Sequence, residues 1–287
     1  MPLITLFDPW QSNICTCPRK LTLNPYTGCD HNCVYCYAQS YIPRFHLCRP
    51  KKNLLKCLSR EAAKLKGETI SLSNSSDPYP RIEGEVGLTR ETLKTLARNW
   101  CQIQIITKST LVARDADILR EAPATVALTI TTDDDDIAKI LEPNAPKPSE
   151  RLKTVETLVK QGILVSVRID PIIPFVNSEF NSLVEKIASF GVKHITVSTY
   201  KARNRDWKRF SQALPDVAEK LAPLYWSQGE HIGGCVLLPR GLRQKLLNGI
   251  RCAALHYGLQ FAVCREGLSE LNTATCDGSW QLPVIAR

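Results

Sequence analysis

The sequence predicts an α/β fold in which helices and parallel strands alternate to form a barrel or a partial barrel. Short runs rich in β-branched residues alternate six times with segments of helical periodicity. Glycines and prolines separate these segments, as expected for turns between regular elements. Polar residues follow the ends of several expected strands, which is where the sites of parallel barrels form.

The first two βα units follow an irregular N-terminal segment. Residues 19–23, Arg-Lys-Leu-Thr-Leu, alternate polar and apolar side chains as a half-buried strand does. A helix is expected over 51–66, where the apolar side chains recur at helical spacing at Leu54, Leu55, Leu58, Ala62 and Leu65. Thr69–Ser73 predicts the second strand, and the polar loop 74–83 follows it.

The next units repeat the order. Glu91 in the first turn favours a helix over 89–100. A strand is expected at 102–107, a helix at 111–122 and a strand at 125–131. The acidic run 133–136 that follows is expected to be a solvated loop or a helix start.

The last units are delimited by prolines and glycines. Ser149 is the expected N-cap of a helix to Gln161, before Gly162. A strand over 164–169 is expected to break at the prolines that follow. A helix over 179–190 and a strand over 195–200 complete six units.

The remaining residues depart from this alternation. Helices are expected over 206–222 and 240–257, with a short strand at 259–263. The sequence therefore divides into an N-terminal segment with the first strand (1–23), a barrel (24–200) and a C-terminal extension (201–287) that covers the barrel mouth.

The chain has 287 residues, a net charge of +9 and twelve cysteines. No apolar run of about 18 residues occurs, so no membrane span is expected. The N-terminus lacks the features of a signal peptide. We therefore expect a cytoplasmic protein whose cysteines bind metal rather than form disulfides. The basic residues of 201–209 and 240–251 predict either a solvated face or a surface for an anionic substrate.

Three of the cysteines form one motif, Cys29-x3-Cys33-x2-Cys36. Thiolates at this spacing can bind three irons of a 4Fe-4S cluster and leave the fourth iron open to a small molecule. A zinc site with His31 or Cys48 as fourth ligand is an alternative, although zinc sites usually use paired Cys-x2-Cys units. Unpaired structural thiols are a third interpretation.

The context of the motif resembles a known family. The three cysteines, with Tyr35 before the last of them, resemble the signature of the radical S-adenosylmethionine (SAM) superfamily. The longer run Gly-Cys-x3-Cys-x-Tyr-Cys-Tyr-Ala-Gln resembles its spore photoproduct lyase-like branch, often labelled "DNA repair photolyase". The resemblance continues to about residue 200, roughly two thirds of the chain.

This resemblance implies a partial (β/α)6 TIM-type barrel of the radical SAM type, with a 4Fe-4S cluster and SAM as cofactors. A low-potential electron donor such as ferredoxin or flavodoxin would reduce the cluster. SAM would then yield a 5′-deoxyadenosyl radical that abstracts hydrogen from the substrate, while the protein positions the cofactor and excludes water.

Several residues match positions that contact SAM in the family. Lys108 resembles a lysine near the SAM carboxylate, and a surface lysine at a strand end is the alternative. Thr129 stands where the family has a serine, and otherwise reads as a core-facing strand residue. Tyr35 or Tyr37 is expected against the adenine, unless both only shield the cluster.

Acidic residues near the strand ends have competing interpretations. Asp77 and Glu83 follow the second strand and match a Ser-Asp motif of the family, so either could bind the SAM amino group or substrate hydroxyls. An Asx turn at Asp77 is equally consistent with the sequence. Arg168 and Asp170 end the fifth strand and could face the barrel mouth, although a structural salt bridge is the commoner outcome.

The C-terminal extension contains four scattered cysteines. Cys264 and Cys276, with Cys235 and Cys252 as further partners, are candidates for a second iron–sulfur cluster. Buried thiols without metal would give the same loose spacing, because free cysteine is among the most buried residue types.

The substrate is not specified by these motifs. The positive charge and the resemblance favour a nucleotide or nucleic acid, and the alternatives are a peptide or small metabolite, or a non-catalytic zinc- or cluster-binding nucleic-acid module. Asn74 occupies the place of a cysteine that donates hydrogen in spore photoproduct lyase. We therefore predict that the protein does not repair spore photoproduct by that relay, unless Cys48, Cys101 or a C-terminal cysteine supplies the hydrogen.

Overall fold

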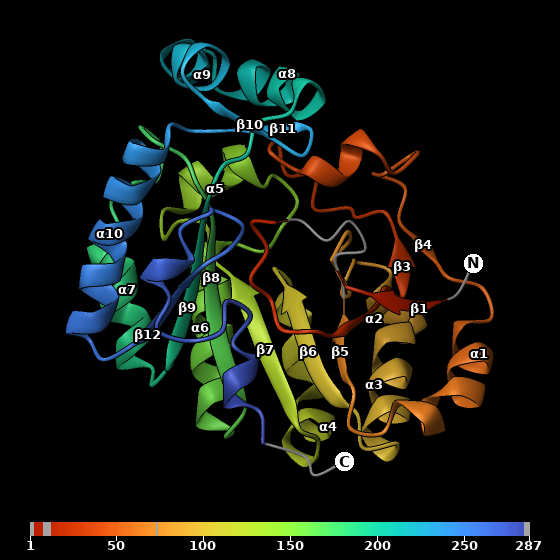
Figure 1. Ribbon diagram of the computed structural model, residues 1–287. Coiled ribbons are helices and arrows are strands. Elements are labelled where there is room, and N and C mark those ends of the chain that lie inside the picture. The colour runs from red at the N-terminus through yellow and green to blue at the C-terminus, as the bar shows by residue number, and fades with distance from the viewer. Residues whose placement is uncertain (1–2, 8–12, 73, 284–287) are drawn as a thin grey trace.

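The computed structural model describes residues 3–7, 13–72 and 74–283, and its centre is an eight-stranded sheet curved into a partial barrel (Figure 1). The sheet order is β1-β2-β5-β6-β7-β8-β9-β12, with β1 antiparallel to β2 and every other pair parallel. Its strands are β1 (Ile4–Leu6), β2 (Leu21–Leu23), β5 (Thr69–Leu72), β6 (Gln102–Thr107), β7 (Ala124–Thr129), β8 (Leu164–Ile172), β9 (His194–Thr199) and β12 (Gln260–Val263). Two small antiparallel pairs are β3 (Tyr26–Thr27) with β4 (Arg49–Pro50) and β10 (Glu230–Ile232) with β11 (Cys235–Leu237).

Helices follow the strands and cover the outside of the barrel (Figure 1). The α-helices are α1 (Leu54–Glu61), α2 (Glu83–Val86), α3 (Leu88–Arg98), α4 (Ala116–Glu121), α5 (Asp135–Leu141), α6 (Pro148–Lys160), α7 (Asn181–Ser189), α8 (Asn204–Ala213), α9 (Pro215–Ala222) and α10 (Arg240–His256). The short helices are the 3-10 turns η1 (Tyr37–Ser40), η2 (Ala62–Leu65), η3 (Thr110–Asp115), η5 (Ser269–Leu271) and η6 (Ser279–Gln281), and the π-helix η4 (Pro223–Ser227).

The predicted α/β partial barrel is confirmed, and the differences have local causes. The strand predicted at 164–169 continues through Pro171 to Ile172 after a register shift. The helix predicted over 206–222 is two helices, since Pro215 lacks the N–H that a continuous helix needs. The acidic run 133–136 starts α5, where the carboxylate of Asp134 caps the N-terminus.

The strands mostly alternate between an apolar outward face and a polar inward face, with Ile106 and Ala127 as exceptions on the inward face. Outward residues such as Ile103, Ile105, Val126 and Leu128 are fully buried under the helices. Most inward residues are polar, and Lys20 before β2 reaches Gln104 of β6, two strands away, with a 2.9 Å hydrogen bond. The concave face of the sheet is therefore a polar interior rather than the aliphatic core of many barrels.

The C-terminal segment fills part of this interior. Thr196 donates to the carbonyl of Cys276 (2.8 Å), and Gln104 donates to the carbonyl of Asp277 (2.6 Å). A Cβ on Gly278 would lie 3.2 Å from His194 and from Ser166, so the backbone packs directly on the barrel wall. Figure 1 shows this blue segment crossing the concave face of the sheet.

Part of the segment 201–283 belongs to the barrel itself. β12 adds to the sheet beside β9, and α10 packs against α7 and β12. Between them, α8, α9, η4 and the β10–β11 hairpin form a lid over the barrel mouth (Figure 1). The lid has its own aromatic core, in which the hydroxyl of Tyr225 donates to the carbonyl of Tyr200 (2.7 Å). Within the described residues, no helix has the length and apolar character needed to cross a membrane.

Candidate active site

The cysteine loop lies between β3 and η1 at the carboxyl ends of the strands. Gly28 has φ +84°, and a Cβ there would lie 2.4 Å from the carbonyl oxygen of Phe45. Only glycine fits this turn, because the conformation and the close approach both exclude a side chain. The N–H of Cys29 then donates to the same carbonyl (2.8 Å), which fixes the start of the loop.

Hydrogen bonds hold the rest of the loop against the end of α5 and the residues that follow it. The N–H of Val34 donates to Leu141 (2.9 Å), and the N–H of Asn144 donates to the carbonyl of His31 (3.1 Å). The amide of Gln39 donates to the carbonyl of Cys33 (3.0 Å). The thiols are therefore carried on a loop whose main chain is held from several sides.

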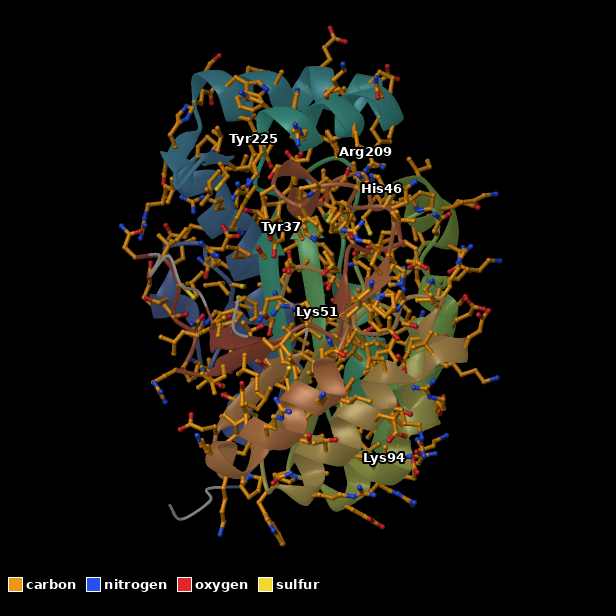
Figure 2. The ribbon with its side chains drawn as sticks, turned by 90° about the vertical axis from the view of Figure 1, so that its right-hand side faces the viewer. Tyr37, His46, Lys51, Lys94, Arg209 and Tyr225 are labelled. Atoms are coloured by element: carbon orange, nitrogen blue, oxygen red, sulfur yellow. The ribbon has the colours of Figure 1, made fainter. Side chains whose placement is uncertain are left out.

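The lid is fastened to this loop by Arg209 of α8. Its guanidinium donates to the carbonyl and the side-chain oxygen of Asn32 (3.2 and 2.8 Å) and to the side-chain oxygen of Gln39. Figure 2 shows Arg209 beside His46, whose ring nitrogen lies 3.3 Å from it. Arg209 thus holds Asn32, which precedes Cys33, and Gln39, which follows Cys36, against the lid.

The three thiols are protonated and at least partly buried, and the positive charge of bound iron would favour loss of their protons. Cys29 and Cys33 are buried, and Cys36 is partly buried. Burial raises the pKa of all three thiols, to about 12 for Cys33, while the cation of Lys108 lowers the pKa of Cys33 and Cys36. Such thiols lose their protons when a metal centre binds. Among the described residues, no three His, Cys, Asp or Glu side chains group as ligands of one metal ion.

A buried network lies beside the thiols and is centred on Glu142. The hydroxyl of Thr131 donates to Oε1 of Glu142 (2.5 Å), the hydroxyl of Tyr35 donates to the same oxygen, and Arg151 pairs with Oε2. The ammonium of Lys108 lies 3.8 Å from Oε1 and 5.6 Å from the centre of the Tyr35 ring. Tyr35 therefore packs into this network.

The charges of this network depend on one another. Burial would raise the pKa of Glu142, but Arg151 and Lys108 offset this effect and lower the pKa to about 2. Burial would lower the pKa of Lys108, but Glu142 and the nearby Cys33 keep it above its ordinary value. Both groups are ionised at neutral pH, so a cation is held beside the cysteine loop.

Asp77 is fully engaged by protein groups. Its Oδ1 accepts from the N–H of Tyr79 (2.9 Å) and the hydroxyl of Thr107 (2.6 Å), and its Oδ2 accepts from the N–H of Lys108 (2.9 Å). His31 Nδ1 lies 3.5 Å from Oδ2. The carboxylate thus forms an Asx turn and joins the loop after β5 to the end of β6, where Lys108 begins.

Glu83 supports the fold of the neighbouring helix. It is fully buried and accepts from the hydroxyl of Tyr26 (2.5 Å), the N–H of Thr89 (2.8 Å) and the guanidinium of Arg114 (2.6 Å). These partners satisfy both oxygens, so Glu83 holds the start of α3 and does not face the barrel mouth.

The other predicted residues lie on β7, β8 and the cysteine loop. Thr129 is the last residue of β7, and by strand alternation its side chain shares the inward face with Thr125. Arg168 donates to Asp170 (2.7 Å), which is the predicted salt bridge. The hydroxyl of Tyr37 donates to the carbonyl of Asn74 (2.6 Å) and so ties the cysteine loop to the loop after β5.

Cys48 and Cys101 lie at opposite ends of the barrel. Cys101 precedes β6, is fully buried, and donates to the carbonyl of Leu65 (3.4 Å) at the amino ends of the strands. Cys48 lies near the cysteine loop, where burial and the charges of Asp30 and Asp77 raise its pKa to about 12.

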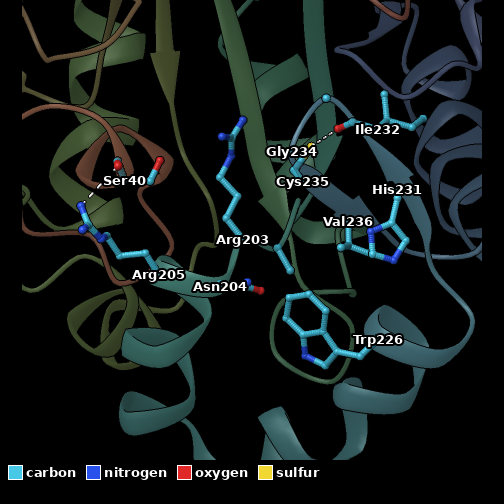
Figure 3. A pocket seen from close by; sticks show the side chains of 12 residues that line it. Ser40, Arg203, Asn204, Arg205, Trp226, His231, Ile232, Gly234, Cys235 and Val236 are labelled. Carbon is cyan, nitrogen blue, oxygen red and sulfur yellow. Dashed lines mark hydrogen bonds between the residues drawn. The ribbon is translucent and has the colours of Figure 1, made fainter.

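A cavity of about 470 Å³ opens between the lid and η1. Its walls are the N-terminus of α8, the β10–β11 hairpin, Trp226 of the π-helix and Ser40 (Figure 3). Arg203 extends through it, and its guanidinium carbon lies 6.0 Å from the centre of the Tyr37 ring. Arg205 points to the wall instead and donates to the carbonyl of Ser40 (3.3 Å).

Most of the late basic residues stabilise the fold. Lys201 and Arg243 pair with Glu266, Arg240 pairs with Glu270, and the guanidinium of Arg251 donates to the carbonyl of Leu271. Arg203 forms no salt bridge with any residue that the structure describes. Three residues of the predicted basic surface are therefore ion-paired and others bond to carbonyls, while Arg203 and Arg205 line the cavity without a salt bridge to any described residue.

The C-terminal cysteines are only partly brought together. The sulfur of Cys276 lies at hydrogen-bonding distance (3.1 Å) from that of Cys17, with no disulfide between them, and Cys264 lies near the guanidinium of Arg168. Cys235 donates to the carbonyl of Ile232 (2.9 Å), and Cys252 is exposed on α10. Within the described part of the chain, neither of the latter two bonds to Cys264 or Cys276, so the four predicted cysteines are not one group.

Two central residues of the network, Glu142 and Arg151, were missed from the sequence. Arg151 carried a signal, because it lies four residues before Val155 and seven before Leu158 on the apolar face of α6. A charge on such a face predicts a buried partner. Glu142, in the loop after α5, gave no comparable sign, because its partners come from four different elements.

Comparisons with known proteins agree with this geometry. A sequence model of the radical SAM superfamily matches residues 23–187, more than half of the chain. An uncharacterized protein of Mycobacterium tuberculosis is 27% identical over 235 residues, which cover 74% of this chain and 69% of that protein. An uncharacterized protein of Methanocaldococcus jannaschii is 33% identical over 162 residues, 54% of this chain and 61% of that protein.

A solved structure shares the fold. Spore photoproduct lyase complexed with dinucleoside spore photoproduct superimposes with a TM-score of 0.65 and 17% identity, covering 83% of this chain and 74% of the lyase. The family match decides against the non-catalytic zinc- or cluster-binding module. The chain belongs to the radical SAM superfamily, and it is a radical SAM enzyme of spore photoproduct lyase-like fold whose family uses a 4Fe-4S cluster and SAM.

Proposed function

We propose that this radical SAM enzyme acts on a phosphate-bearing substrate, a nucleotide or a nucleic acid, that binds in the cavity under the lid. The observation that carries the proposal is Arg203, a cation without a salt-bridge partner among the described residues, which stands between the cavity and Tyr37 of the cysteine loop. A guanidinium matches phosphate geometry, and the Trp226 ring offers a face for stacking a base.

The residues around the cysteine loop suit the two cofactors of the family. Cys29, Cys33 and Cys36 hold three irons of the 4Fe-4S cluster, and Lys108 faces the SAM carboxylate. Bound there, cluster and SAM supply the electron and the 5′-deoxyadenosyl radical that takes a hydrogen atom from substrate. Thr129, on the inward face of β7, contacts SAM through its hydroxyl.

Asp77 contributes by position rather than by contact with SAM. Oδ1 accepts from Tyr79 and Thr107, and Oδ2 accepts from the N–H of Lys108, so the protein already uses both oxygens of the carboxylate. The carboxylate fixes the main chain of Lys108 and thereby the origin of the side chain that neutralises the SAM carboxylate. A ferredoxin or flavodoxin is the expected electron donor.

The dinucleoside lesion bound by the structurally similar lyase supports a nucleotide substrate, but the chemistry here differs. The side-chain amide of Asn74 donates to the hydroxyl of Thr22, and the main-chain carbonyl of Asn74 accepts from the hydroxyl of Tyr37. An amide cannot replace a thiol as a hydrogen-atom donor, so repair of spore photoproduct is not expected. Clean catalytic conversion of dinucleotide spore photoproduct to two thymines by the reduced enzyme with SAM would contradict this.

Binding of a fluorescent single-stranded oligodeoxynucleotide to the anaerobic holoenzyme tests the substrate class. Arg203→Ala should weaken binding by about 10- to 150-fold, because a hydrogen bond to a charged group contributes about 1.5–3 kcal/mol. The slope of log affinity against log salt should also fall by about 1. Arg98→Ala removes an exposed arginine at the end of α3, at the amino ends of the strands, and should change neither value.

Equal binding by both variants would overturn the assignment of Arg203. No binding of the oligonucleotide or of a mononucleotide by the wild type would overturn the substrate class and favour a peptide or a small metabolite. The cofactor chemistry is tested separately, by formation of 5′-deoxyadenosine without substrate.

A further inference from the structure

Cysteines from the two ends of the chain meet at the open side of the barrel. Cys15 and Cys17 lie in the segment between β1 and β2, and Cys264 directly follows β12. Since β1 and β12 are the two edge strands of the sheet, these segments flank the gap that a partial barrel leaves. Figure 1 shows the red N-terminal and blue C-terminal segments together across this side.

Contacts confirm that the cysteines are neighbours although 259 residues separate Cys17 from Cys276. Their sulfur atoms lie 3.1 Å apart. Cys15 and Cys17 are hydrogen-bonding partners, and Cys264 is close enough to act electrostatically on Cys17. Four of the nine cysteines outside the family motif thus gather in one place.

Buried cations flank this group on both sides. The ammonium of Lys20 lies in the barrel interior and acts on Cys17 and Cys276, although its hydrogen bonds go to Gln104 and Asp277. The guanidinium of Arg168 is close enough to Cys264 to interact with it electrostatically. Against the effect of Cys15, the contact with Cys276 and burial nevertheless raise the pKa of Cys17, so metal binding would have to displace its proton, as it does at other buried thiol ligands.

We propose that Cys15, Cys17, Cys264 and Cys276 bind a second iron–sulfur cluster that closes the open side of the barrel. The group does not form a preformed pocket for one metal ion, and the Cys29, Cys33 and Cys36 motif of the described chain shares that property. In a cluster the thiolates are distributed over several irons, so they need not surround one point. Soft thiolate ligands favour zinc, copper(I) and iron–sulfur centres, and the four thiols would lose their protons on binding.

The site differs from the predicted one in two of its four ligands. Cys235 and Cys252 are replaced by Cys15 and Cys17, because the partners of Cys276 come from the N-terminal segment. The spacing of cysteines in the C-terminal part alone therefore could not identify the group.

The test uses a variant from which the family cluster has been removed, Cys29→Ala with Cys33→Ala and Cys36→Ala. After anaerobic reconstitution and desalting, this variant should retain iron and acid-labile sulfide in equal amounts, and reduction should produce an electron paramagnetic resonance signal. Adding Cys17→Ser and Cys276→Ser should remove both metal and signal. Adding Cys57→Ser and Cys252→Ser instead is the matched control and should leave them in place.

The proposal is overturned if the folded triple variant holds no iron, or if its iron survives Cys17→Ser with Cys276→Ser. Zinc in place of iron and sulfide, or a disulfide between Cys17 and Cys276 in anaerobic protein, would also overturn it. If the Cys17 and Cys276 variant does not fold by circular dichroism, Cys15→Ser with Cys264→Ser decides by the same measurements. None of these readouts depends on SAM cleavage or on the substrate.

Discussion

Two lysines point into the barrel, and their surroundings differ. Lys20, near the amino ends of the strands, lies 2.5 Å from Asp277 and 2.9 Å from Gln104, and only 1% of its side chain is exposed. Lys108, at the carboxyl ends, lies 3.8 Å from Glu142 and keeps 16% of its side chain exposed. The first ammonium is saturated by its neighbours, whereas the second can still bind an anion.

This difference suggests different roles for the two lysines of the barrel interior: Lys20 stabilises the fold, and Lys108 is available for function. The ion pair of Lys20 with Asp277 holds the C-terminal segment against the barrel, because Asp277 belongs to that segment. Lys108 lies beside the cysteine loop. Its partner Glu142 also forms an ion pair with Arg151. Removing the charge of Lys20 should therefore destabilise the fold, and removing the charge of Lys108 should mainly weaken ligand binding.

The largest effect is expected for Lys20→Met. Removing one partner of a buried pair typically costs about 3–5 kcal/mol, because the remaining charge is left without compensation. Lys108→Met should cost much less, since Arg151 still pairs with Glu142. Denaturant unfolding monitored by circular dichroism measures both. A Lys20→Met variant as stable as the wild type would contradict the stabilising role given to Lys20.

The second prediction uses pH. Burial would raise the pKa of Asp277, but Lys20 offsets it and lowers the pKa to about 2. A carboxyl with a lowered pKa stabilises the folded state above about pH 4, and this contribution is lost as the pH falls toward 2. A shift of this size corresponds to about 2 kcal/mol. Asp277→Asn should be less stable at pH 7 and should have a flatter stability profile between pH 5 and 2. An unchanged profile would show that this ion pair contributes little.

The third prediction concerns SAM affinity. Lys108→Met should weaken binding of SAM to the reconstituted enzyme by about 10- to 150-fold, from the 1.5–3 kcal/mol of a charge-assisted hydrogen bond. Lys64→Met, at an exposed position of η2, is the matched control. Isothermal titration measures both affinities, and equal affinities would remove Lys108 from the SAM site.

The sequence was sufficient for the barrel because its strands carry a local signal. In β6, for example, the apolar residues Ile103 and Ile105 alternate with inward polar residues. The cysteine loop was also identifiable, since spacing and ligand chemistry are both local. The candidate site was predictable where a residue directly follows a strand, as Lys108 does.

The parts that were missed depend on contacts between distant segments. Nothing near Glu142 in the sequence shows that Tyr35, Thr131 and Arg151 converge on it. The C-terminal segment inside the barrel and the meeting of Cys17 with Cys276 arise in the same way. Tertiary packing also brings the backbone N–H groups of Tyr79 and Lys108 to Asp77, contacts of which the sequence could predict only the local Asx turn.

The most direct test of the account is reductive SAM cleavage by anaerobically reconstituted protein, with 5′-deoxyadenosine measured by mass spectrometry. The wild type should form it with dithionite or with a reduced flavodoxin. The variant with Cys29→Ala, Cys33→Ala and Cys36→Ala should form none, because these are the thiolates proposed to hold the cluster whose open iron would bind SAM. Formation of 5′-deoxyadenosine by the triple variant at the wild-type rate would contradict the account.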